Sequence, residues 1–501
     1  MRRACGSAGR SDATDEVLKA DAVVIGSGAG GAPAAARLAA AGLEVIVLEA
    51  GARLETRDFD GDAAKLLPRL MKAATARDSG MQLYAGTCVG GSTVVNDALC
   101  WRPPPDVLER WRGEHGLTGL TDAALAPHVD RVWREINATP TDRAHLNRNA
   151  HRLELGAARL GWAGEAMPRN VRGCVNLGLC NLGCPSGAKQ SALLTWLPQA
   201  ERAGARVIPL ARAERIEVAA GRARAVDAVR LDPATGAAAG RLRVEAQRVI
   251  AAAGVLETPA LLLRSGLDAG RGLHFHSSVY VTARFPEPVL GFFGPTMAYA
   301  VTEFSDVNGR RGPGYMIENV TVSPSVTASS LPGFGVEHER AMQALTHLAR
   351  AVVVLHDRAR GRAEIGSDGR PRIAYAPVPE DLARLRDAIR QVAGLYLEAG
   401  ALEVYLPVNG LAPVRSPGEL ARLDAADLSP RDFSLLYAVH LFGGAAMAGS
   451  RAGGTCDEDG RVWGVAGLWV SDASSLPTNT GVNPQVTIMA NALRVAEGAA
   501  T

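Results

Sequence analysis

The stretch from residue 21 to residue 51 is the part of the sequence that most constrains how this chain folds. A short apolar run at 22–25 predicts a strand, the alanine-rich stretch at 32–41 a helix, and the apolar run at 43–48 a second strand buried in a parallel sheet. Three glycines in the spacing G-x-G-x-x-G lie between the first strand and the helix, namely Gly26, Gly28 and Gly31. This order of elements predicts a βαβ unit of the Rossmann kind.

Each glycine has a physical role in such a unit. The first permits the turn, the second lets a pyrophosphate approach the backbone, and the third lets the helix pack against the strand. The helix N-terminus favours phosphate charge, and Glu49, at the end of the second strand, is placed to accept hydrogen bonds from a ribose diol. A purely structural turn is the alternative. The chain has no second G-x-G-x-x-G, which argues against a separate nicotinamide-binding half.

Composition and charge narrow the class of protein. The 501 residues are 47% hydrophobic and 21% charged, which is typical of a globular chain with a sizeable core. The net charge is only +2, and no run of Lys or Arg is interleaved with aromatic residues, so we expect no nucleic-acid partner. No stretch of about 18 apolar residues predicts a membrane span. Seven cysteines and an N-terminus without an apolar signal segment lead us to expect a cytoplasmic protein.

Three further stretches carry a family resemblance: GTCVGGSTVVN at 86–96, GVLETPALLLRSGL at 254–267, and GLWVSDASSLPTNTGVNPQVTIMANALRVAEG at 467–498. Together they resemble the signatures of the GMC (glucose–methanol–choline) oxidoreductases, over nearly the whole chain. The resemblance implies FAD as the cofactor. The first stretch resembles the loop that passes over the flavin ring, and no histidine stands in it where some members tether FAD, so we expect non-covalent FAD. The contacts expected from this loop come from Gly86, Gly90, Gly91, Ser92 and Asn96.

The rest of the chain supplies the other cofactor contacts that the resemblance implies. The second stretch departs from the family pattern at Val255 and at the following Asp268, and neither position touches the expected chemistry. Contacts with the adenine, with the pyrophosphate or ribityl chain, and with the flavin are expected from Ala213, Asp472, Ala473, Asn483 and Pro484. The last two residues open the final helix, whose N-terminal amides favour negative charge on a reduced flavin.

The reaction expected of such a protein explains the candidate catalytic residues. Oxidising an alcohol removes a hydroxyl proton while a hydride leaves the carbon for flavin N5, so a proton acceptor and a group that orients the oxygen are needed. The family pairs a His with a second His or an Asn, and the matching positions here are His440 and Asn483. Imidazole suits a general base because its pKa lies near the operating pH. Asn483 is expected to position the oxygen, although Asn is also a good helix N-cap.

The resemblance also implies the fold and its domains. We expect an α/β FAD-binding Rossmann-like domain of the GMC type with an inserted α+β substrate domain built on an antiparallel sheet. Residues 1–105, 190–274 and 436–501 are expected to form the discontinuous FAD-binding domain, and 106–189 a lid or Cys-rich connecting segment. Residues 275–435 are expected to form the substrate domain.

Within residues 275–435 the sequence predicts strands at VYVTARF and GYMIENVTVSP and helices at 337–355 and 380–399. Glu318 falls on the apolar face of one of these strands and is a candidate for binding a cationic or hydroxylated substrate. Glu303 and Asp306 are weaker candidates of the same kind. His274 and His276 alternate at the start of this region, and we expect them to be structural and not to bind a metal.

Cys174, Cys180 and Cys184 lie within eleven residues, followed by a Gly-Ala-Lys sequence. Their spacing resembles the run that binds an iron–sulfur cluster in certain sugar dehydrogenases of the family. The same Cys-rich loop also occurs in relatives that work with FAD alone. We therefore expect packing or pocket-lining cysteines and no metal, with the iron–sulfur cluster as the second interpretation and a disulfide or zinc site as the third.

The expected activity is the FAD-dependent oxidation of an alcohol, most simply a primary one, to an aldehyde or ketone. A small-molecule sugar or aminoglycoside-type polyol is the first substrate class. The alternatives are a long-chain or sterol alcohol, a sugar dehydrogenase with an added cluster, and a GMC lyase or decarboxylase. Molecular oxygen and an electron carrier are both open as the acceptor.

Overall fold

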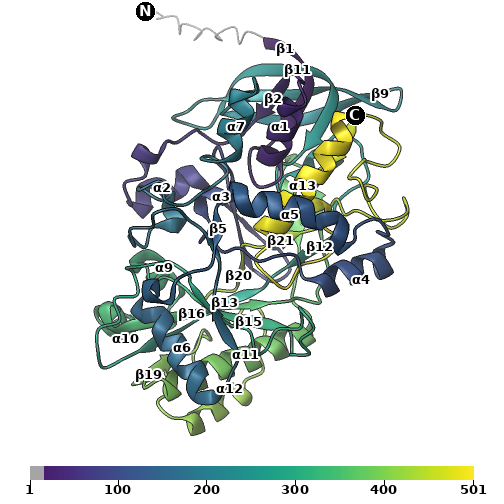
Figure 1. Ribbon diagram of the computed structural model, residues 1–501. Helices are drawn as coiled ribbons and strands as arrows, with labels where there is room; N and C mark the ends of the chain where they lie inside the picture. The colour runs from purple at the N-terminus through teal and green to yellow at the C-terminus, as the bar shows by residue number, and fades with distance from the viewer. Residues whose placement is uncertain (1–15) are drawn as a thin grey trace, which may run out of the picture.

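The computed structural model describes residues 16–501, so the expectation about the N-terminal segment lies outside the described residues. Two large β-sheets dominate the molecule (Figure 1). One, near the N-terminus, occupies the upper half of the view, and the other, which carries β13, β15 and β16, occupies the lower half. The last helix, coloured yellow, lies against the upper part.

The upper sheet has seven strands. Six of them lie in the order β8-β2-β1-β11-β10-β9, and the seventh, the short strand β22, pairs with β11. The parallel members are β1 (Glu16–Ile25), β2 (Val45–Leu48), β8 (Arg206–Ile208), β11 (Ala238–Ala251) and β22 (Leu468–Val470). The antiparallel members are β9 (Ala211–Ala219) and β10 (Arg222–Leu231). The long strand β11 pairs with β10 along its first half and with β22 at its end, which brings the C-terminal part of the chain into the same sheet as β1, with β11 between the two strands.

The βαβ unit expected from the sequence is present. The end of β1 and all of β2 are buried, as parallel strands covered on both faces should be. Between them lies α1 (Gly31–Ala40), which packs against α7 (Trp196–Arg202) and α13 (Gln485–Ala500). Gly26 has a φ of +99°, and a Cβ on Gly31 would lie 1.8 Å from the carbonyl oxygen of Gly26. The turn therefore requires glycine at both ends.

The lower sheet has nine strands, and α6 (Arg148–Leu160) and α11 (Pro379–Glu398) pack against one of its faces. Its strands are β3 (Met71–Thr75), β4 (Gln82–Gly86), β6 (Gly164–Ala166), β13 (Ser278–Arg284), β14 (Tyr299–Val301), β15 (Tyr315–Asn319), β16 (Leu348–Leu355), β19 (Glu403–Tyr405) and β20 (Tyr437–Ala438). Four of these, β3, β4, β6 and β20, come from outside residues 275–435, so the sheet is assembled from several parts of the chain. The domain limits expected from the sequence stay predictions.

One expected helix is wrong. The helix predicted at 337–355 covers only α10 (Val336–Gln343) and a short 3-10 turn, and its second half is the strand β16. All eight residues of β16 are buried, between β13 and β15 at the centre of the sheet. A short, mostly apolar run with three consecutive valines and one charged residue, Arg350, suits a central strand better than a helix with one exposed face. The helix expected at 380–399 is confirmed as α11.

The remaining elements connect the two sheets. A four-stranded sheet contains β12 (Arg271–Phe275), β17 (Gly361–Ile365), β18 (Pro371–Ala374) and β21 (Leu441–Phe442), and a two-stranded one contains β5 (Ala138–Thr139) and β7 (Arg169–Asn170). The other helices are α2 (Ala63–Leu70), α3 (Ser92–Val95), α4 (Pro105–His115), α5 (Asp122–Glu135), α8 (Thr258–Arg264), α9 (Pro324–Ser330) and α12 (Ala421–Asp424). Within residues 16–501, none of the helices has the length and apolar character needed to span a bilayer.

The contact between α1 and the turn makes a direct prediction. Replacing Gly31 with Ala places a methyl group against the carbonyl of Gly26, so we expect α1 to shift and the free energy of unfolding to fall by about 1–3 kcal/mol. Gly113→Ala is the matched control, because Gly113 lies exposed in the last turn of α4 with free space around its Cα. The control should gain roughly 0.5–1 kcal/mol from helix propensity. Urea unfolding of both variants tests this, and a G31A variant as stable as the parent would contradict it.

Candidate active site

The glycine-rich turn and Glu49 form a connected unit at the carboxyl end of β1 and β2. The backbone N–H and the hydroxyl of Ser27 both donate to Oε2 of Glu49, at 3.0 and 2.7 Å, and the N–H of Gly51 donates to Oε1 at 2.9 Å. Burial raises the pKa of Glu49, and these three donors oppose that rise. The carboxylate therefore lies where the sequence predicts a ribose contact, and it is already oriented by the turn itself.

The loop at 86–96 lies directly against this turn. The N–H of Gly90 donates to Oγ of Ser27 at 3.0 Å, and a Cβ on Gly91 would lie 2.7 Å from Cα of Gly28. At the start of the loop, the N–H of Gly86 donates to Oγ of Ser92 at 2.9 Å. Two stretches of backbone without side chains thus face each other, which leaves room for a cofactor to lie close to the main chain.

Asn96 links the end of this loop to α13. Its Nδ2 donates to Oε1 of Gln485, the first residue of that helix, at 3.0 Å. Near this helix start, four buried side-chain oxygens lack a partner among residues 16–501, and they belong to Asp97, Glu318, Asn483 and Thr487. Unpaired buried polar atoms are costly unless a ligand or water satisfies them. The polar edge of a flavin ring is a group that fits this need.

Lys189 is a residue for which the sequence predicted no role in the site. Its side chain is buried, and Nζ donates to the carbonyl oxygens of Val94 at 2.6 Å, Asn96 at 2.8 Å and Cys180 at 2.6 Å. Burial lowers the pKa of Lys189 to about 8. The lysine joins the loop at 86–96 to the Cys-rich segment. Its sequence signal was the Gly-Ala-Lys that follows the cysteines.

The three cysteines each have a separate environment. Cys180 accepts a bond from Nη2 of Arg169 at 3.2 Å, and Cys184 accepts one from the backbone N–H of Lys189 at 3.3 Å. Cys174 lies half-buried and donates to Oδ1 of Asn176 at 3.6 Å. All six cysteines in the described part of the chain are free thiols, and no group of three or more Cys, His, Asp or Glu in that part is arranged to hold a metal ion.

The C-terminal signature brings Asp472 to the end of β22. Its Oδ2 accepts hydrogen bonds from the N–H of Gly254 at 2.7 Å and from the hydroxyl of Thr258 at 2.6 Å, and its Oδ1 accepts one from the N–H of Ser474 at 2.8 Å. Asp472 thus joins the second and third signatures, and Ala473 follows it in a short 3-10 turn. Ala213 lies in β9, at the far edge of the same sheet.

His440, Asn483 and Glu318 converge from three distant parts of the sequence. Nδ2 of Asn483 lies 3.5 Å from Nε2 of His440 and 3.5 Å from Oε2 of Glu318. Glu318 is 0% exposed and Asn483 is 8% exposed. Asn483 makes no capping bond to α13, whose N-cap residue is Pro484. The arrangement surrounds one amide with an imidazole and a carboxyl group.

Burial controls the charge of this group. It lowers the pKa of His440 to about 4 and raises the pKa of Glu318 to about 8, the latter with a smaller contribution from the charge of Asp97. Both side chains are therefore neutral near pH 7. A neutral site suits a neutral hydroxyl group.

His276 lies behind His440. The Nδ1 atoms of the two rings are 3.1 Å apart, and the backbone N–H of Gly481 donates to Nε2 of His276 at 3.0 Å. The sequence predicted a structural role for this histidine, and its signal was its position just after β12, where the chain passes from the four-stranded sheet towards the lower sheet. His274 belongs to β12 and has an unpartnered Nδ1 within the described chain.

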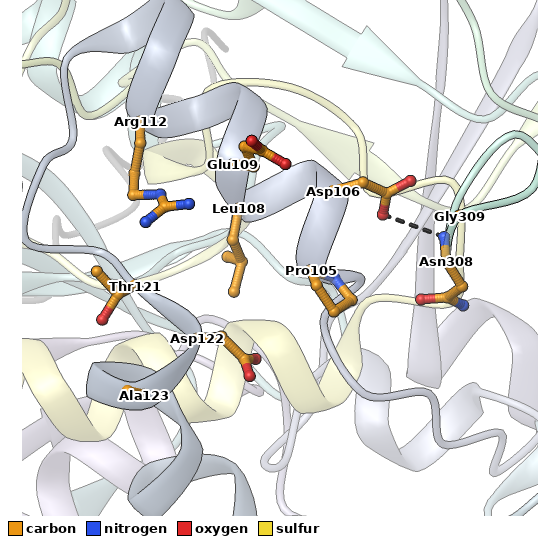
Figure 2. Close-up of a pocket in the computed structure, with 10 residues that line it drawn as sticks. All are labelled: Pro105, Asp106, Leu108, Glu109, Arg112, Thr121, Asp122, Ala123, Asn308 and Gly309. Atoms are coloured by element: carbon orange, nitrogen blue, oxygen red, sulfur yellow. Dashed lines mark hydrogen bonds between the residues drawn. The ribbon is translucent and has the colours of Figure 1, made fainter.

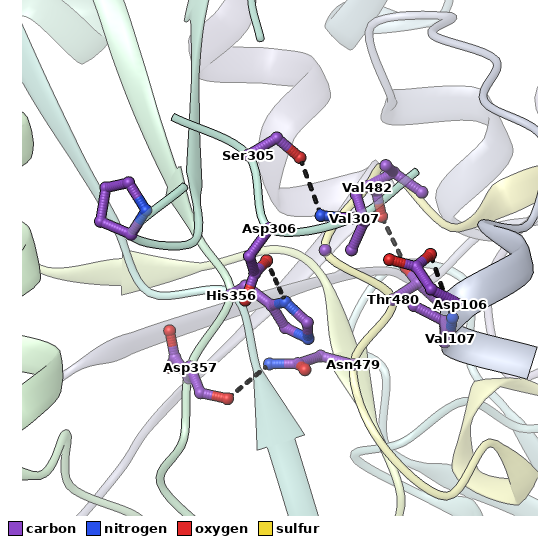
Figure 3. Close-up of polar contacts among 12 residues, drawn as sticks. Asp106, Val107, Ser305, Asp306, Val307, His356, Asp357, Asn479, Thr480 and Val482 are labelled. Carbon is purple, nitrogen blue, oxygen red and sulfur yellow. Dashed lines mark hydrogen bonds and ion pairs between the residues drawn. The ribbon is translucent and has the colours of Figure 1, made fainter. Parts of the chain in front are cut away.

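The two weaker acidic candidates lie apart from these residues. Asp306 pairs with Nδ1 of His356 at 2.7 Å and with Arg358 at 2.9 Å, as Figure 3 shows for the histidine. Glu303 is exposed and accepts a bond from the N–H of Ala163 at 2.9 Å. Neither carboxylate contacts His440 or Asn483.

The sheet face that carries Glu318 is largely apolar and aromatic, and Arg350 of β16, stacked on the ring of Tyr280, is a charged residue on it. Cross-strand pairing places Tyr280, Val352, Glu318 and Ala300 in one row across β13, β16, β15 and β14. Residues opposite each other in neighbouring strands point to the same face. A buried cluster separate from the cores of the two halves occupies this face, and it contains Leu99, Met167, Met297, Ala300, Val320, Val352, Val354 and Tyr437.

A surface depression of about 560 Å³ lies elsewhere, between α4 and the start of α5 (Figure 2). Its lining includes Asp106, Glu109, Arg112 and Asp122, and Asp106 also accepts a bond from the N–H of Asn308 at 3.1 Å. None of the residues that line it belongs to the group around Asn483. It is therefore distinct from the candidate active site.

Comparison with known proteins agrees with this geometry. Residues 20–278 and 357–492 match the N- and C-terminal profiles described as GMC oxidoreductase. An uncharacterized GMC-type oxidoreductase of Mycobacterium tuberculosis is 38% identical over 96% of this chain and 76% of its own. A long-chain-alcohol oxidase of Arabidopsis thaliana is 29% identical over 95% of this chain and 66% of its own, and a paromamine 6'-oxidase of Streptomyces fradiae is 28% identical over 98% and 93%.

The solved structure of pyridoxine 4-oxidase from Mesorbium loti superposes with a TM-score of 0.72 at 19% identity, over 95% of this chain and 98% of the other. This likeness confirms the fold expected from the sequence, a Rossmann-like FAD domain with a substrate domain. The profile matches and the 38% identical relative together cover most of the chain. The protein therefore belongs to the GMC oxidoreductases, FAD-dependent enzymes that act on CH–OH donors.

Proposed function

We propose that the protein oxidises a primary alcohol carried on an apolar body to the aldehyde. The observation that carries this proposal is the convergence of His440, Asn483 and Glu318 on one point, at the edge of an apolar and aromatic sheet face. Bound FAD supplies the hydride acceptor, at flavin N5. The residues of this chain have the tasks of holding the hydroxyl group, excluding water and handling its proton.

The cofactor contacts expected from the sequence are kept as part of the proposal. The pyrophosphate and ribose contacts come from the turn and from the end of β2, and the contacts with the ring come from the loop at 86–96 and the start of α13. The proposed residues are Gly26, Gly28, Gly31, Glu49, Gly86, Gly90, Gly91, Ser92, Asn96, Ala213, Asp472, Ala473, Asn483 and Pro484. Binding is proposed to be non-covalent.

The proposed catalytic residues are His440 and Asn483. Asn483 is buried with one amide oxygen free of any partner in residues 16–501, so it has a hydrogen-bonding group available for the substrate oxygen. His440 lies beside it, and burial keeps its imidazole neutral. The role expected of His440 from the sequence is that of general base.

Substrate class follows from the surroundings of this group. A polyol or an amino sugar needs many hydrogen-bonding partners, because burying a hydroxyl group without a new hydrogen bond costs free energy. The face beside Glu318 offers Tyr280, Val352 and Ala300 in the same row, which suits an apolar chain or ring. Similarity to the long-chain-alcohol oxidase supports this choice, and similarity to paromamine 6'-oxidase supports the amino sugar as the competing class.

Two features of the reaction stay open within the proposal. The electron acceptor is molecular oxygen or a separate carrier. A lyase or decarboxylase is the competing reaction type, and the imidazole–amide pair favours alcohol oxidation because a decarboxylase has no hydroxyl group to hold.

A panel of substrates tests the proposal. The purified flavoprotein is mixed without oxygen with long-chain primary alcohols, with sterols and with amino sugars, and the visible absorbance band of the oxidised flavin is followed. We expect long-chain primary alcohols to bleach the band fastest, because their chains suit the apolar face. Failure of every alcohol to bleach it would contradict alcohol oxidation, and faster bleaching by amino sugars would contradict the substrate class. Peroxide measured after oxygen is admitted separates an oxidase from a dehydrogenase.

Removal of the imidazole makes a second prediction. His440→Ala should slow flavin reduction by about 10²–10⁴-fold, the range for loss of a positioned proton-transfer group. His145→Ala is the control, because this histidine is exposed and lies outside the site. Stopped-flow reduction with a saturating alcohol measures the effect. An H440A variant that is reduced as fast as the H145A variant would remove His440 from the mechanism.

A further prediction concerns the lysine under the flavin loop. Lys189→Met keeps an unbranched side chain, shorter by the terminal ammonium group, and leaves three carbonyl groups without their donor. Each unsatisfied buried polar group costs about 1–3 kcal/mol. We expect the variant to unfold at lower urea concentration and to release FAD on gel filtration, with Lys65→Met as the exposed control. Retention of FAD and of parental stability would contradict the assigned role.

A further inference from the structure

The hydrogen bonds of His276 determine where its proton lies. A backbone N–H only donates, so Nε2 of His276, which receives the N–H of Gly481 at 3.0 Å, carries a lone pair. A neutral imidazole has a single ring proton, and in His276 that proton is therefore on Nδ1. Burial and the neighbouring His440 and His356 hold the pKa of His276 well below its usual value, so the ring is neutral.

The same reasoning passes to His440. Its Nδ1 lies 3.1 Å from Nδ1 of His276 and accepts the hydrogen bond that the Nδ1–H of His276 donates. Because burial keeps His440 neutral as well, its own proton must be on Nε2, the nitrogen that faces Asn483. His440 thus presents an N–H group, and not a lone pair, on the side of the candidate substrate position.

The backbone N–H of Gly481, which is the first donor in this series of hydrogen bonds, lies in a segment that other hydrogen bonds hold in place. Gly481 belongs to the segment 479–482, and Nδ2 of Asn479 donates to the carbonyl oxygens of Phe275 at 2.6 Å and Asp357 at 3.1 Å. The hydroxyl of Thr480 donates to the carbonyl of Val482 at 2.7 Å, and Figure 3 shows both residues beside His356. Moving the proton of His276 to Nε2 would set two N–H groups against each other. The tautomer is therefore fixed by the backbone.

The amide of Asn483 fits this arrangement. Its oxygen has no partner within residues 16–501, whereas its nitrogen lies 3.5 Å from Nε2 of His440. A half-turn about the terminal torsion exchanges the two atoms and lets the oxygen accept the N–H of His440. The same oxygen then also accepts the proton of a neutral Glu318, and Nδ2 becomes free to donate to a substrate oxygen.

A histidine whose facing nitrogen already carries a proton does not take up a second one without becoming a buried cation. Glu318 is the nearest alternative acceptor, since its Oε2 lies against Asn483 and its Oε1 is buried and unpartnered in the described chain. Asp97 disfavours its ionisation, and Arg350 lies in the neighbouring strand β16, two residues from the partner of Glu318 in the sheet. The guanidinium of Arg350 stacks 3.6 Å from the ring of Tyr280 and bonds to Thr327 and Ser330 instead of Glu318.

We infer that His276 is a positioning residue that fixes the proton of His440 on Nε2, and that Glu318, not His440, takes up the hydroxyl proton of the alcohol. This inference rests on the proposed function and changes one assignment within it. The O–H bond breaks and its proton goes to the Glu318 carboxylate. The C–H bond breaks with its electron pair leaving as hydride to oxidised FAD, and the C=O bond forms. Nδ2 of Asn483 donates a hydrogen bond to the substrate oxygen throughout, and the Nε2–H of His440 holds the amide oxygen of Asn483 in place.

The carboxyl variant is the first test. Glu318→Gln should slow reduction of the FAD-loaded enzyme by alcohol about 10²–10⁴-fold while changing the Kd for the alcohol little, with Glu303→Gln as the exposed control. In the parent the rate should rise as pH rises through about 8, because the ionised carboxylate is the acceptor, and this rise should be absent from E318Q. Glu318→Asp should restore part of the rate and the pH dependence, and it serves if E318Q folds poorly. An E318Q variant reduced within about threefold of the parent would overturn the role of Glu318.

The histidine pair is tested without reference to activity. Nitrogen-15 NMR of protein labelled at histidine distinguishes protonated from unprotonated ring nitrogens, and loss of a signal in His440→Asn assigns it. We expect Nε2 of His440 to be protonated in the parent and in His276→Asn, whose amide nitrogen still donates at the Nδ1 position. In His276→Asp the carboxylate should draw the proton to Nδ1 of His440. An unprotonated Nε2 in the parent would overturn the inference, whereas failure of every alcohol to reduce the parent's flavin would instead overturn the proposed function.

Discussion

A pair of short backbone segments, 274–278 and 437–442, joins the two halves of the molecule. His274 pairs with Phe442 and Phe275 with Leu441, then the N–H of His276 donates to the carbonyl of His440 at 3.2 Å, and Ser278 pairs with Tyr437. The chain passes from the four-stranded sheet to the lower sheet along one segment and returns along the other. Their antiparallel register brings the two imidazoles together, so the proposed catalytic group is built into the connection between the sheets. Any change in this pairing would displace both rings at once.

Low polarity at this junction gives its hydrogen bonds their directional character. His276, His440 and Glu318 are all neutral near pH 7 because burial penalises their charged forms. Neutral groups have definite donor and acceptor atoms, so one fixed backbone N–H at Gly481 is enough to order the whole series. In a wetter site, water would exchange with these partners and the tautomer would not be determined by the fold.

The sequence predicted the βαβ unit of the upper half and, in the lower half, the strands β13 and β15 and the helix α11, but not how these elements meet at the site. The glycine spacing at 26–31 and the apolar runs on both sides are local signals, because the turn requires glycine wherever it occurs. The proximity of Asn483 to Glu318 depends instead on how α13 meets β15, across 165 residues, and no local pattern encodes such a contact. The strand β16 was mistaken for helix because its burial on both faces removes the alternation that identifies a strand. The role of His276 depends on a backbone N–H, which a sequence does not display.

Lys189 has a consequence for how the flavin loop moves. One ammonium group holds carbonyls from α3, from the residue that ends the loop and from the Cys-rich segment. Opening either segment alone would leave a buried charge with fewer partners, so the two should open together as a single cooperative unit. Their amide hydrogens would then exchange with solvent at one common rate, and a reagent that modifies the half-buried thiol of Cys184 would also report on the loop above the cofactor. The Cys-rich segment is in this sense a mechanical part of the proposed cofactor site.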